Sequence, residues 1–426
     1  MANGNFAGGS GTELSPYLIE DAHDLNAVRK GLNKCYKLVK DIDLDVNPFN
    51  IGEGWKPIGG VDNAFTGVFD GSNHVIQNLY INKTDINDAG FFGVLYCCKI
   101  INLGLINTNI TAKEYVGGIA GRCIINNNKD YIIIDHCYVI GNIIASLGCC
   151  GGLIGTSNGY TFDSVIIKNC YSKGTVSSNS NEVGGISGKL HSSTILNCFS
   201  DCNIQANAYA GGLSGSINAY CCITNCYVKG DSIKASVIAG GLTGSANVQN
   251  IIKNSFSISN ILCLDRPGGI MGDTPNLLKQ TFTNSYWDVE TSNQTISKGG
   301  TGKTTLEMKT PSTFIDWDKE KLENGKGVWI LQDGQYPKLW FEKPPAKHLF
   351  KQNNQYYSIK SELYNDSKFQ PITELQGKSS LSKDDYNNFG IDDLNILTQN
   401  MTVGTETFRP IDKFTGEIEI YKYTEK

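Results

Sequence analysis

Residues 297–305, SKGGTGKTT, have the types and spacing of a loop that binds nucleotide phosphate. In such a loop, glycine N–H groups surround the phosphate and a lysine neutralises it, between a buried strand and a helix. The residues before it, VETSNQTISK, are mostly polar, whereas a buried parallel strand is an apolar run. Pro311 would end a following helix early. We therefore predict a polar turn with Lys303 facing solvent and no nucleotide site.

Two further arrangements bear on metal or nucleophilic chemistry. His136 and Cys137 are adjacent, but neighbours on a strand point to opposite faces and cannot converge on one ligand. The five histidines are scattered, and the acidic residues of the repeats do not recur in one column. We therefore predict no catalytic, cofactor-binding or metal-binding residue. An acidic pair brought together by folding, as glycoside hydrolysis requires, stays open as an alternative.

Residues 41–47, DIDLDVN, place Asp41, Asp43 and Asp45 on one face of a strand, an arrangement that suits calcium. The EF-hand pattern fails, because Val46 stands where its glycine is required and Gly52 where its last glutamate is required. An outward polar strand face is the expected structure, and calcium binding is left open.

Composition bounds the class of protein. The 426 residues are 40% hydrophobic and 19% charged, with a formal net charge of -5. No cluster of lysine and arginine indicates nucleic acid as a partner. We see no Sec signal and no apolar run long enough to span a bilayer, so we expect a protein made in the cytoplasm without a membrane partner. The 14 cysteines are too dilute for a disulfide scaffold.

A repeat dominates the sequence between residues 116 and 290. Six segments read GG-apolar-x-G, and their second glycines lie 27 to 34 residues apart, at Gly118, Gly152, Gly185, Gly212, Gly241 and Gly269. A second signature reads Asn-Cys/Ser-aromatic. Its asparagines are Asn169, Asn197, Asn225, Asn254 and Asn284, with His136 at the equivalent place in an earlier copy and Asn78 and Asn102 before it. Its cysteines are Cys137, Cys170, Cys198 and Cys226.

These segments alternate apolar and polar residues and are divided by glycine, asparagine and serine, which predicts strands. A unit of this length cannot bury its own apolar face, so successive units must stack as coils of a solenoid. Equivalent residues then lie about 4.8 Å apart in columns. We expect the asparagines to form a hydrogen-bonded ladder, the cysteines to fill a tight inward position, and the glycines to serve positive φ or close backbone approach.

The GG-[LI]-x-G units resemble the GLUG repeats of bacterial surface proteins and of some phage tail proteins. The resemblance extends from the opening segment NFAGGSGTELSPYLIEDAHDLNAVRK, through FTGVFDGSNHVIQNLYI, to the closing YWDVETSNQTISKGGTGKTT and VWILQDGQYPKLW. It implies a β-helical fold and does not specify an activity. The residues beyond Pro344-Pro345 resemble C-terminal segments of phage and prophage tail proteins.

The expected architecture is all-β: a parallel β-solenoid of seven to eight coils with a short N-terminal helical cap and a small C-terminal β-containing module. The expected divisions are an N-terminal cap with the first strands at 1–58, repeats at 59–290, a closing segment at 291–343 and the module at 344–426. Within the closing segment, the glycines of SKGGTGKTT should turn the chain out of the stack.

The expected function is a non-catalytic structural and receptor-binding component of a phage tail or tail-like particle. Its expected partners are a cell-surface polysaccharide or protein receptor and other particle proteins, with a homotrimer as one assembly. The alternatives are a bacterial cell-surface adhesin and a glycan depolymerase of the tailspike type.

Overall fold

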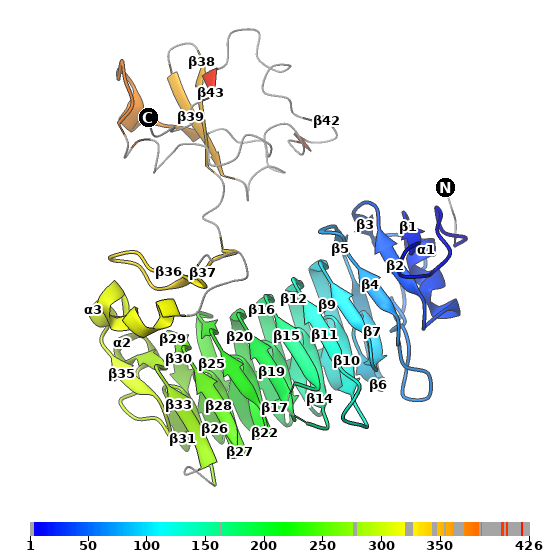
Figure 1. The fold of residues 1–426 in the computed structure, drawn as a ribbon, viewed down its shortest axis with the longest axis horizontal. Helices are drawn as coiled ribbons and strands as arrows, with labels where there is room; N and C mark the ends of the chain where they lie inside the picture. Colours follow the sequence, from blue (N-terminus) through cyan, green and yellow to red (C-terminus); the bar gives the residue numbers. More distant parts are fainter. Residues whose placement is uncertain are drawn as a thin grey trace. The chain divides into compact units, whose positions relative to one another are not determined.

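The computed structural model describes residues 4–161, 163–275, 279–319, 327–342, 347–352, 355–360, 370–382 and 385, and short strands at 402–403, 406–407 and 419–420. The chain divides into two compact units, Met1–Leu339 and Trp340–Lys426. The first unit is a parallel β-solenoid of about nine turns (Figure 1), which confirms the predicted fold class. The predicted division at Pro344 lies outside the described residues.

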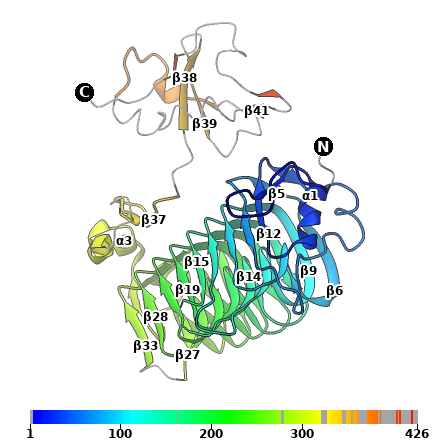
Figure 2. The same ribbon diagram turned by 45° about the vertical axis from the view of Figure 1, so that its right-hand side comes forward.

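One coil shows how the repeat folds. Strand β15 (Val165–Lys168) belongs to the first sheet, β16 (Tyr171–Ser178) and β17 (Glu182–Gly184) belong to the second, and β18 (Ser187–Leu190) belongs to the third. Each strand pairs in parallel with its equivalent in the next coil, as Tyr171 pairs with Phe199. Figure 2 shows these coils as successive layers. The chain therefore returns to the same lateral position once per repeat.

The first sheet, called sheet A, has ten strands. They are β1 (Tyr17–Ile19), β2 (Cys35–Leu38), β4 (Val68–Asp70), β8 (Lys99–Ile101), β11 (Ile132–Asp135), β15, β19 (Ser193–Leu196), β23 (Cys222–Thr224), β28 (Asn250–Lys253) and β33 (Gln280–Thr283). The solenoid has more turns than the seven to eight predicted, because β1 and β2 of the expected cap already pair within this sheet.

The second sheet, sheet B, carries the longest strands. Its members are β3 (Ile42–Asp43), β5 (Val75–Gln77), β6 (Tyr80–Ala89), β9 (Gly104–Gly117), β12 (Tyr138–Ala145), β13 (Cys150–Gly151), β16, β17, β20 (Phe199–Ala206), β21 (Tyr209–Gly211), β24 (Tyr227–Val228), β25 (Ser232–Ala235), β26 (Ile238–Gly240), β29 (Phe256–Ser257), β30 (Asn260–Leu262), β31 (Arg266–Gly268), β34 (Tyr286–Asp288) and β35 (Thr301–Lys303).

The third sheet, sheet C, completes each coil after the glycine pair. It comprises β7 (Phe92–Leu95), β10 (Ala120–Ile124), β14 (Ile154–Asn158), β18, β22 (Ser214–Ala219), β27 (Thr243–Val248) and β32 (Met271–Asp273). The three sheets enclose an apolar core.

Inward isoleucines of sheet A form one column of that core. The paired positions are Ile134, Ile167, Ile195, Ile223 and Ile252, and each is at most 1% exposed. Their β-branched side chains suit the strand backbone. Full burial of such a side chain contributes about 1.5–3 kcal/mol. The solenoid is therefore stabilised by the same contact repeated from coil to coil.

The glycine pairs allow close backbone approach at the corner between sheets B and C. A Cβ on Gly152 would overlap the carbonyl oxygen of Gly185, and one on Gly185 would overlap the Ser200 side chain. None of the six predicted glycines has positive φ. Of the two roles predicted for them, only close approach is therefore observed.

Positive φ angles recur instead at the asparagine corner between sheets A and B. His136 and the seven predicted asparagines, Asn78, Asn102, Asn169, Asn197, Asn225, Asn254 and Asn284, have φ between 45° and 61°. Asparagine adopts this left-handed conformation more readily than most residues, because its short polar side chain bonds locally. The corner geometry therefore accounts for the residue type.

Hydrogen bonds join these asparagines between coils. Asn197 Nδ2 donates to Asn169 Oδ1 at 3.1 Å, and Asn225 Nδ2 donates to Asn197 Oδ1 at 3.2 Å. Where His136 interrupts the column, Asn169 donates to Asp135 Oδ1 at 2.8 Å. Asn78 and Asn102 likewise donate to aspartates, Asp43 and Asp70. The column is thus an asparagine ladder in its middle and asparagine–aspartate pairs near its N-terminal end.

The N-terminal end of the stack is covered by α1 (Ala22–Ala27) and a 3-10 turn, η1 (Val28–Lys30), beside β1 and β2 (Figure 1). Leu25 and Val28 are fully buried. Asp24, also fully buried, accepts N–H bonds from Gly4 and Phe6 at 2.8 and 3.1 Å and so ties down the start of the chain.

At the C-terminal end lie α2 (Val289–Ser292), α3 (Thr305–Met308), the 3-10 segment η3 (Pro311–Lys319), and the hairpin of β36 (Trp329–Ile330) and β37 (Lys338–Leu339). Phe314 and Trp317 are buried against Tyr286 and Phe256, with ring centroids 5.7 to 6.5 Å apart. The closing segment thus covers aromatic residues of the last coils.

The segment SKGGTGKTT does not turn out of the stack, and that prediction is wrong. Strand β35 pairs in parallel with β34 and extends sheet B by one strand. The Ser297 hydroxyl accepts N–H bonds from Ile270 and Met271 at 3.0 and 3.1 Å. The Lys303 side chain was predicted to face solvent. It is 28% exposed, and its Nζ donates to Glu307 Oε1 at 3.0 Å. Gly299 and Gly300 therefore lead into a strand, and the helix that follows Lys303, α3, has only four residues.

The second unit contains a small antiparallel sheet. Its strands are β40 (Gln370–Pro371), β39 (Gln355–Lys360), β38 (Lys347–Gln352) and β43 (Glu419–Ile420), with a separate pair, β41 (Thr402–Val403) and β42 (Glu406–Thr407). A 3-10 turn, η5 (Thr373–Leu375), packs Leu375 with Tyr356 and Ile372. In neither unit does a described helix have the length and apolarity to cross a membrane.

The asparagine corner can be tested with a matched pair of substitutions at Asn197. Asn197→Ala loses both ladder bonds, at about 1 kcal/mol each, and places an alanine in the left-handed region at about 1–2 kcal/mol. Asn197→Gly loses the same bonds without the steric strain. We expect both to lower the melting temperature of the solenoid, measured by circular dichroism, with alanine the more harmful. Equal destabilisation, or a more harmful glycine, would show that backbone conformation does not select asparagine.

Candidate functional site

The predicted cysteine column lies inside the solenoid. Cys137, Cys170, Cys198 and Cys226 are fully buried, and each backbone N–H donates to the side chain one coil further on. The N–Sγ distances are 3.3 to 3.4 Å, and the last donor, Cys226, reaches the hydroxyl of Ser255 at 3.0 Å. Burial raises the pKa of Cys137, Cys170 and Cys198 well above that of a free thiol. They are therefore poor nucleophiles at neutral pH.

His136 and Cys137 do not converge on one ligand. The thiol of Cys137 is in the core, whereas the His136 side chain is 49% exposed and its Nδ1 lies 2.7 Å from Asp135 Oδ1. Among the residues that the structure describes, no group of three or more histidine, cysteine or acidic side chains is placed to hold a metal ion.

The three aspartates considered for calcium each support a local turn or contact. Asp41 Oδ1 accepts from the Val75 backbone N–H at 3.0 Å. Asp43 Oδ1 accepts from the Asp45 N–H and Asn78 Nδ2, both at 2.8 Å, and Asp45 Oδ1 accepts from Asn50 Nδ2 at 2.9 Å. Their oxygens thus serve separate partners.

The aromatic residues of the repeat form a continuous stack along sheet B. Ring centroids of Tyr138, Tyr171, Phe199, Tyr227 and Phe256 lie 4.8 to 5.0 Å apart, with planes within 13°. Because each interior ring has a neighbour on both faces, the stack leaves few open faces on which a sugar could lie. Its contribution is to coil-to-coil packing.

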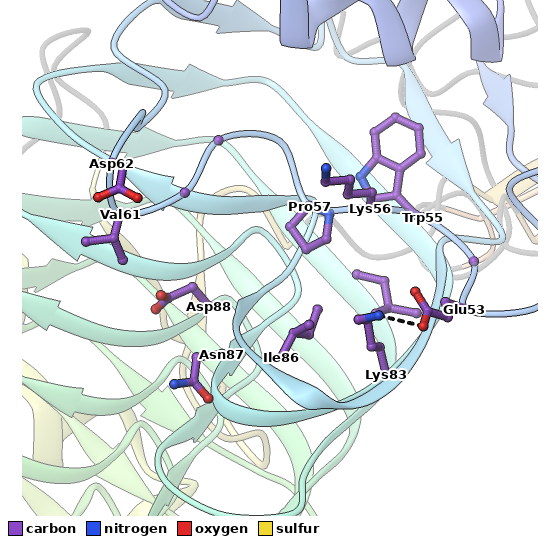
Figure 3. A pocket seen from close by; sticks show the side chains of 14 residues that line it. Glu53, Trp55, Lys56, Pro57, Val61, Asp62, Lys83, Ile86, Asn87 and Asp88 are labelled. Atoms are coloured by element: carbon purple, nitrogen blue, oxygen red, sulfur yellow. Dashed lines mark hydrogen bonds and ion pairs between the residues drawn. The ribbon is translucent and has the colours of Figure 1, made fainter.

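A groove of about 670 Å³ lies beside the first long strand of sheet B. One wall is the loop from Glu53 to Asp62, and the other is formed by residues 81–88 of β6, as Figure 3 shows. The strand is irregular there, because its register with β9 shifts between Lys83 and Asn87. The loop and this irregular strand together leave the space that the regular coils fill.

The loop wall is held by buried anchors. The Trp55 indole is 1% exposed and its Nε1 donates to the Phe91 carbonyl at 3.1 Å. Arg29 stacks 4.8 Å over the Trp55 ring and donates to the carbonyl oxygens of Pro57 and Lys56. The groove is therefore formed by a fixed loop.

Charges of both signs line the groove. Lys83 Nζ bonds Glu53 Oε1 at 2.5 Å, and this bond raises the pKa of the lysine (Figure 3). Asp88, 8% exposed, accepts from Arg122 Nε at 2.7 Å. Burial raises the pKa of Asp88, and the Arg122 guanidinium opposes that shift. Asp62, Lys56 and Asn87 add further polar groups, while Pro57, Ile81 and Ile86 contribute apolar surface.

Two carboxylates of the groove walls are held in ion pairs. Glycoside cleavage requires two carboxyl groups with separate proton roles. In the groove, Glu53 is engaged by Lys83 and Asp88 by Arg122. The polar atoms that remain offer hydrogen bonds beside an apolar surface, as small-molecule sites do.

Sequence reasoning did not identify these groove residues. They lie outside the GG-apolar-x-G repeat, and neither Asp62 nor Asp88 belongs to a motif. The usable signal was the stretch GEGWKPIGG at 52–60, where glycines and a proline surround a tryptophan before the repeats begin.

Comparison with known proteins finds relatives that match part of the chain and a solved structure with a similar fold. No family model matches the chain. A "Putative Gly-rich membrane protein" of Evansella cellulosilytica is 40% identical over 137 residues, which is 31% of this chain and 15% of that protein. "Halomucin" of Haloquadratum walsbyi is 35% identical over 159 residues, which is 35% of this chain and 2% of that protein. The chain therefore spans a small part of either relative.

Among solved structures, a "putative immunoglobulin A1 protease" from Bacteroides ovatus matches with a TM-score of 0.53 and 24% identity. The match covers 80% of this chain and 98% of that one. At this identity the likeness is one of fold.

The buried thiols predict a specific loss of stability in alkali. Because their pKa values lie above 9.0 in the folded chain, the folded protein keeps thiol protons that the unfolded chain loses above pH 9. The free energy of unfolding that the buried thiols contribute is present below pH 9. As the pH rises above 9 it falls by up to about 1.4 kcal/mol per pH unit for each thiol.

Replacing Cys137, Cys170 and Cys198 together by serine puts a hydroxyl in place of each thiol. Ser255 and Ser285 already place a hydroxyl at this position in later coils. We expect the triple variant to lose less stability between pH 8 and pH 10 than the unmodified chain, measured by urea unfolding. Identical pH dependence would mean that these thiols do not stay protonated in the fold.

Proposed function

We propose that the chain is a rigid β-solenoid spacer and binding element whose groove contacts a cell-surface glycan. The observation that carries the proposal is the groove of about 670 Å³ between the 53–62 loop and β6, where apolar and polar groups are held on fixed elements. Its volume lies in the range of small-molecule sites.

The groove chemistry matches that of an uncharged sugar. A sugar ring has an apolar face and hydroxyls that both donate and accept hydrogen bonds. Pro57, Ile81 and Ile86 supply the apolar surface. Lys56 and Asn87 supply donors, and Asp62 and Asn87 supply acceptors. Because both charge signs are present, we do not expect the groove to favour a charged ligand.

The proposed role is binding without catalysis. The pairing of Glu53 with Lys83 and of Asp88 with Arg122 supports this choice over a depolymerase. Affinity at a single groove would be modest, and copies presented side by side would add through multivalency. A rigid solenoid suits that role because its length is fixed.

A spacer with a binding groove could belong to either of two locations, a phage particle or a cell surface. The resemblance of the repeats to GLUG arrays supports a phage tail or tail-like particle. The partial relative named as a membrane protein supports the alternative, an adhesin at a cell surface. Detection of the chain in purified particles or in a cell-surface fraction separates the two.

The groove is tested by Asn87→Ala and Lys56→Ala, with Thr84→Ala as the control. Thr84 is exposed on the same strand and does not line the groove. A lost hydrogen bond of about 0.5–1.5 kcal/mol predicts about 2- to 12-fold weaker binding of neutral oligosaccharides. Ligands would be found on a glycan array and their affinities measured by calorimetry.

Thr84→Ala should bind as the unmodified chain does. The absence of any array ligand, or equal affinity in all three variants, would contradict the proposal. Release of shorter oligosaccharides from a bound glycan would instead establish the depolymerase.

A further inference from the structure

A second pocket, which we call the lysine pocket, lies where the closing segment meets the last coils. It has a volume of about 300 Å³ and lies between the Tyr227–Lys229 and Phe256–Ile258 segments of the solenoid and residues 334–338, with Lys309 beside it. It shares no lining residue with the groove.

The walls of the lysine pocket are held in place. The rings of Tyr227 and Phe256 stack at 5.0 Å, and Phe256 lies 6.4 Å from Tyr336 with planes 15° apart. The Tyr336 hydroxyl donates to Asp288 Oδ2 at 2.6 Å, and the Gly334 N–H donates to the Lys309 carbonyl at 2.9 Å. The pocket therefore does not depend on a ligand to bring its walls together.

The charge lining this pocket has one sign. Among the described residues that line it, the ionisable side chains include three lysines, Lys229, Lys309 and Lys338, and no carboxylate. Lys229 lies 3.9 Å from Asp201 and 4.9 Å from the centre of the Phe199 ring. Lys309 lies 4.9 Å from the centre of the Tyr336 ring, and Lys338 donates to Gln335 at 3.3 Å. Within the described ranges, neither Lys309 nor Lys338 has a carboxylate partner.

The positive charges of Lys309 and Lys338 beside a small cavity attract an anion, and Lys229 adds a third cation that it shares with Asp201. Ile258, Pro337 and the aromatic edges provide an apolar surface beside the charges. That combination fits a group with a charged substituent on a carbon ring better than a free inorganic ion, which gains nothing from the apolar wall.

We propose that the lysine pocket binds an anionic sugar unit, carboxylated or sulfated, of a surface polysaccharide. The proposal rests on the proposed function, that the chain contacts a glycan, and adds to it a second site selective for charge. The groove would hold uncharged sugars and the lysine pocket acidic ones. A polymer containing both kinds of sugar would then be held at two places on one chain.

The test uses the full chain and three tetrasaccharides: tetragalacturonate, a heparin-derived tetrasaccharide and neutral maltotetraose. Binding is measured by calorimetry at 50 mM and 300 mM NaCl. We expect an anionic probe to bind more tightly than maltotetraose, and more weakly at the higher salt concentration, because the lysines are partly exposed and screened. The tighter of the two anionic probes identifies the charged substituent.

The variant Lys309→Ala/Lys338→Ala should weaken anionic binding at least 10-fold. The control is Lys298→Ala, an exposed lysine of the same unit outside the pocket, which should change affinity less than 2-fold. Equal weakening of maltotetraose binding in the double variant, no anionic binding at 50 mM NaCl, or full anionic affinity in the double variant would each overturn the proposal.

The groove variant Asn87→Ala separates the two sites. It should leave anionic binding unchanged while weakening the neutral ligand found on the array. Loss of anionic binding in Asn87→Ala would place the anion in the groove and overturn the lysine pocket. Failure of neutral binding alone would contradict the groove and leave the anionic result standing.

Discussion

In-register stacking of equivalent residues from coil to coil is the constraint on which the rest of the structure depends. Each repeat must return the backbone to the same lateral position, so each corner needs a residue that tolerates its geometry. At one corner, asparagine accepts a left-handed backbone and bonds its neighbours; at another, glycine admits the next carbonyl. Cysteine, isoleucine and aromatic columns then follow, since whatever side chain suits one coil suits the next.

Function in such a molecule is expected where the repetition stops. The regular coils use their polar atoms and ring faces for one another. The groove forms before the regular coils, where the 53–62 loop faces an irregular strand. The lysine pocket forms after them, where residues 334–338 lie against Tyr227 and Phe256. In both places, a segment outside the repeat faces the coils and leaves a cavity beside them.

The fold could be predicted from the sequence because each column of stacked residues appears in the sequence as a regular repeat. The spacing of Gly152 and Gly185, and of Asn169 and Asn197, identified the coils directly. The sequence was insufficient for conformation at the corners: both asparagine and glycine suggest positive φ, and only the structure shows that asparagine has it here. It also misplaced β35, because hydrogen bonding to β34 compensates a polar sequence that has no strand pattern of its own.

The candidate sites were beyond sequence reasoning for a related reason. The groove depends on Arg29 holding a loop that begins more than twenty residues later, and the lysine pocket joins Lys229 to Lys338 across the closing segment. Such contacts arise from the path of the chain and leave no periodic signal.

The central claim, that equivalent coils are interchangeable because they stack in register, is tested most directly by removing one. Deleting residues 170–197 joins Asn169 to Cys198 and would place Phe199 on Tyr138, in the position that Tyr171 occupies. A crystal structure of the shortened chain should show a solenoid one coil shorter, with the Cys137 N–H donating to Cys198 Sγ. An unfolded chain, or one whose remaining columns no longer align, would contradict the account.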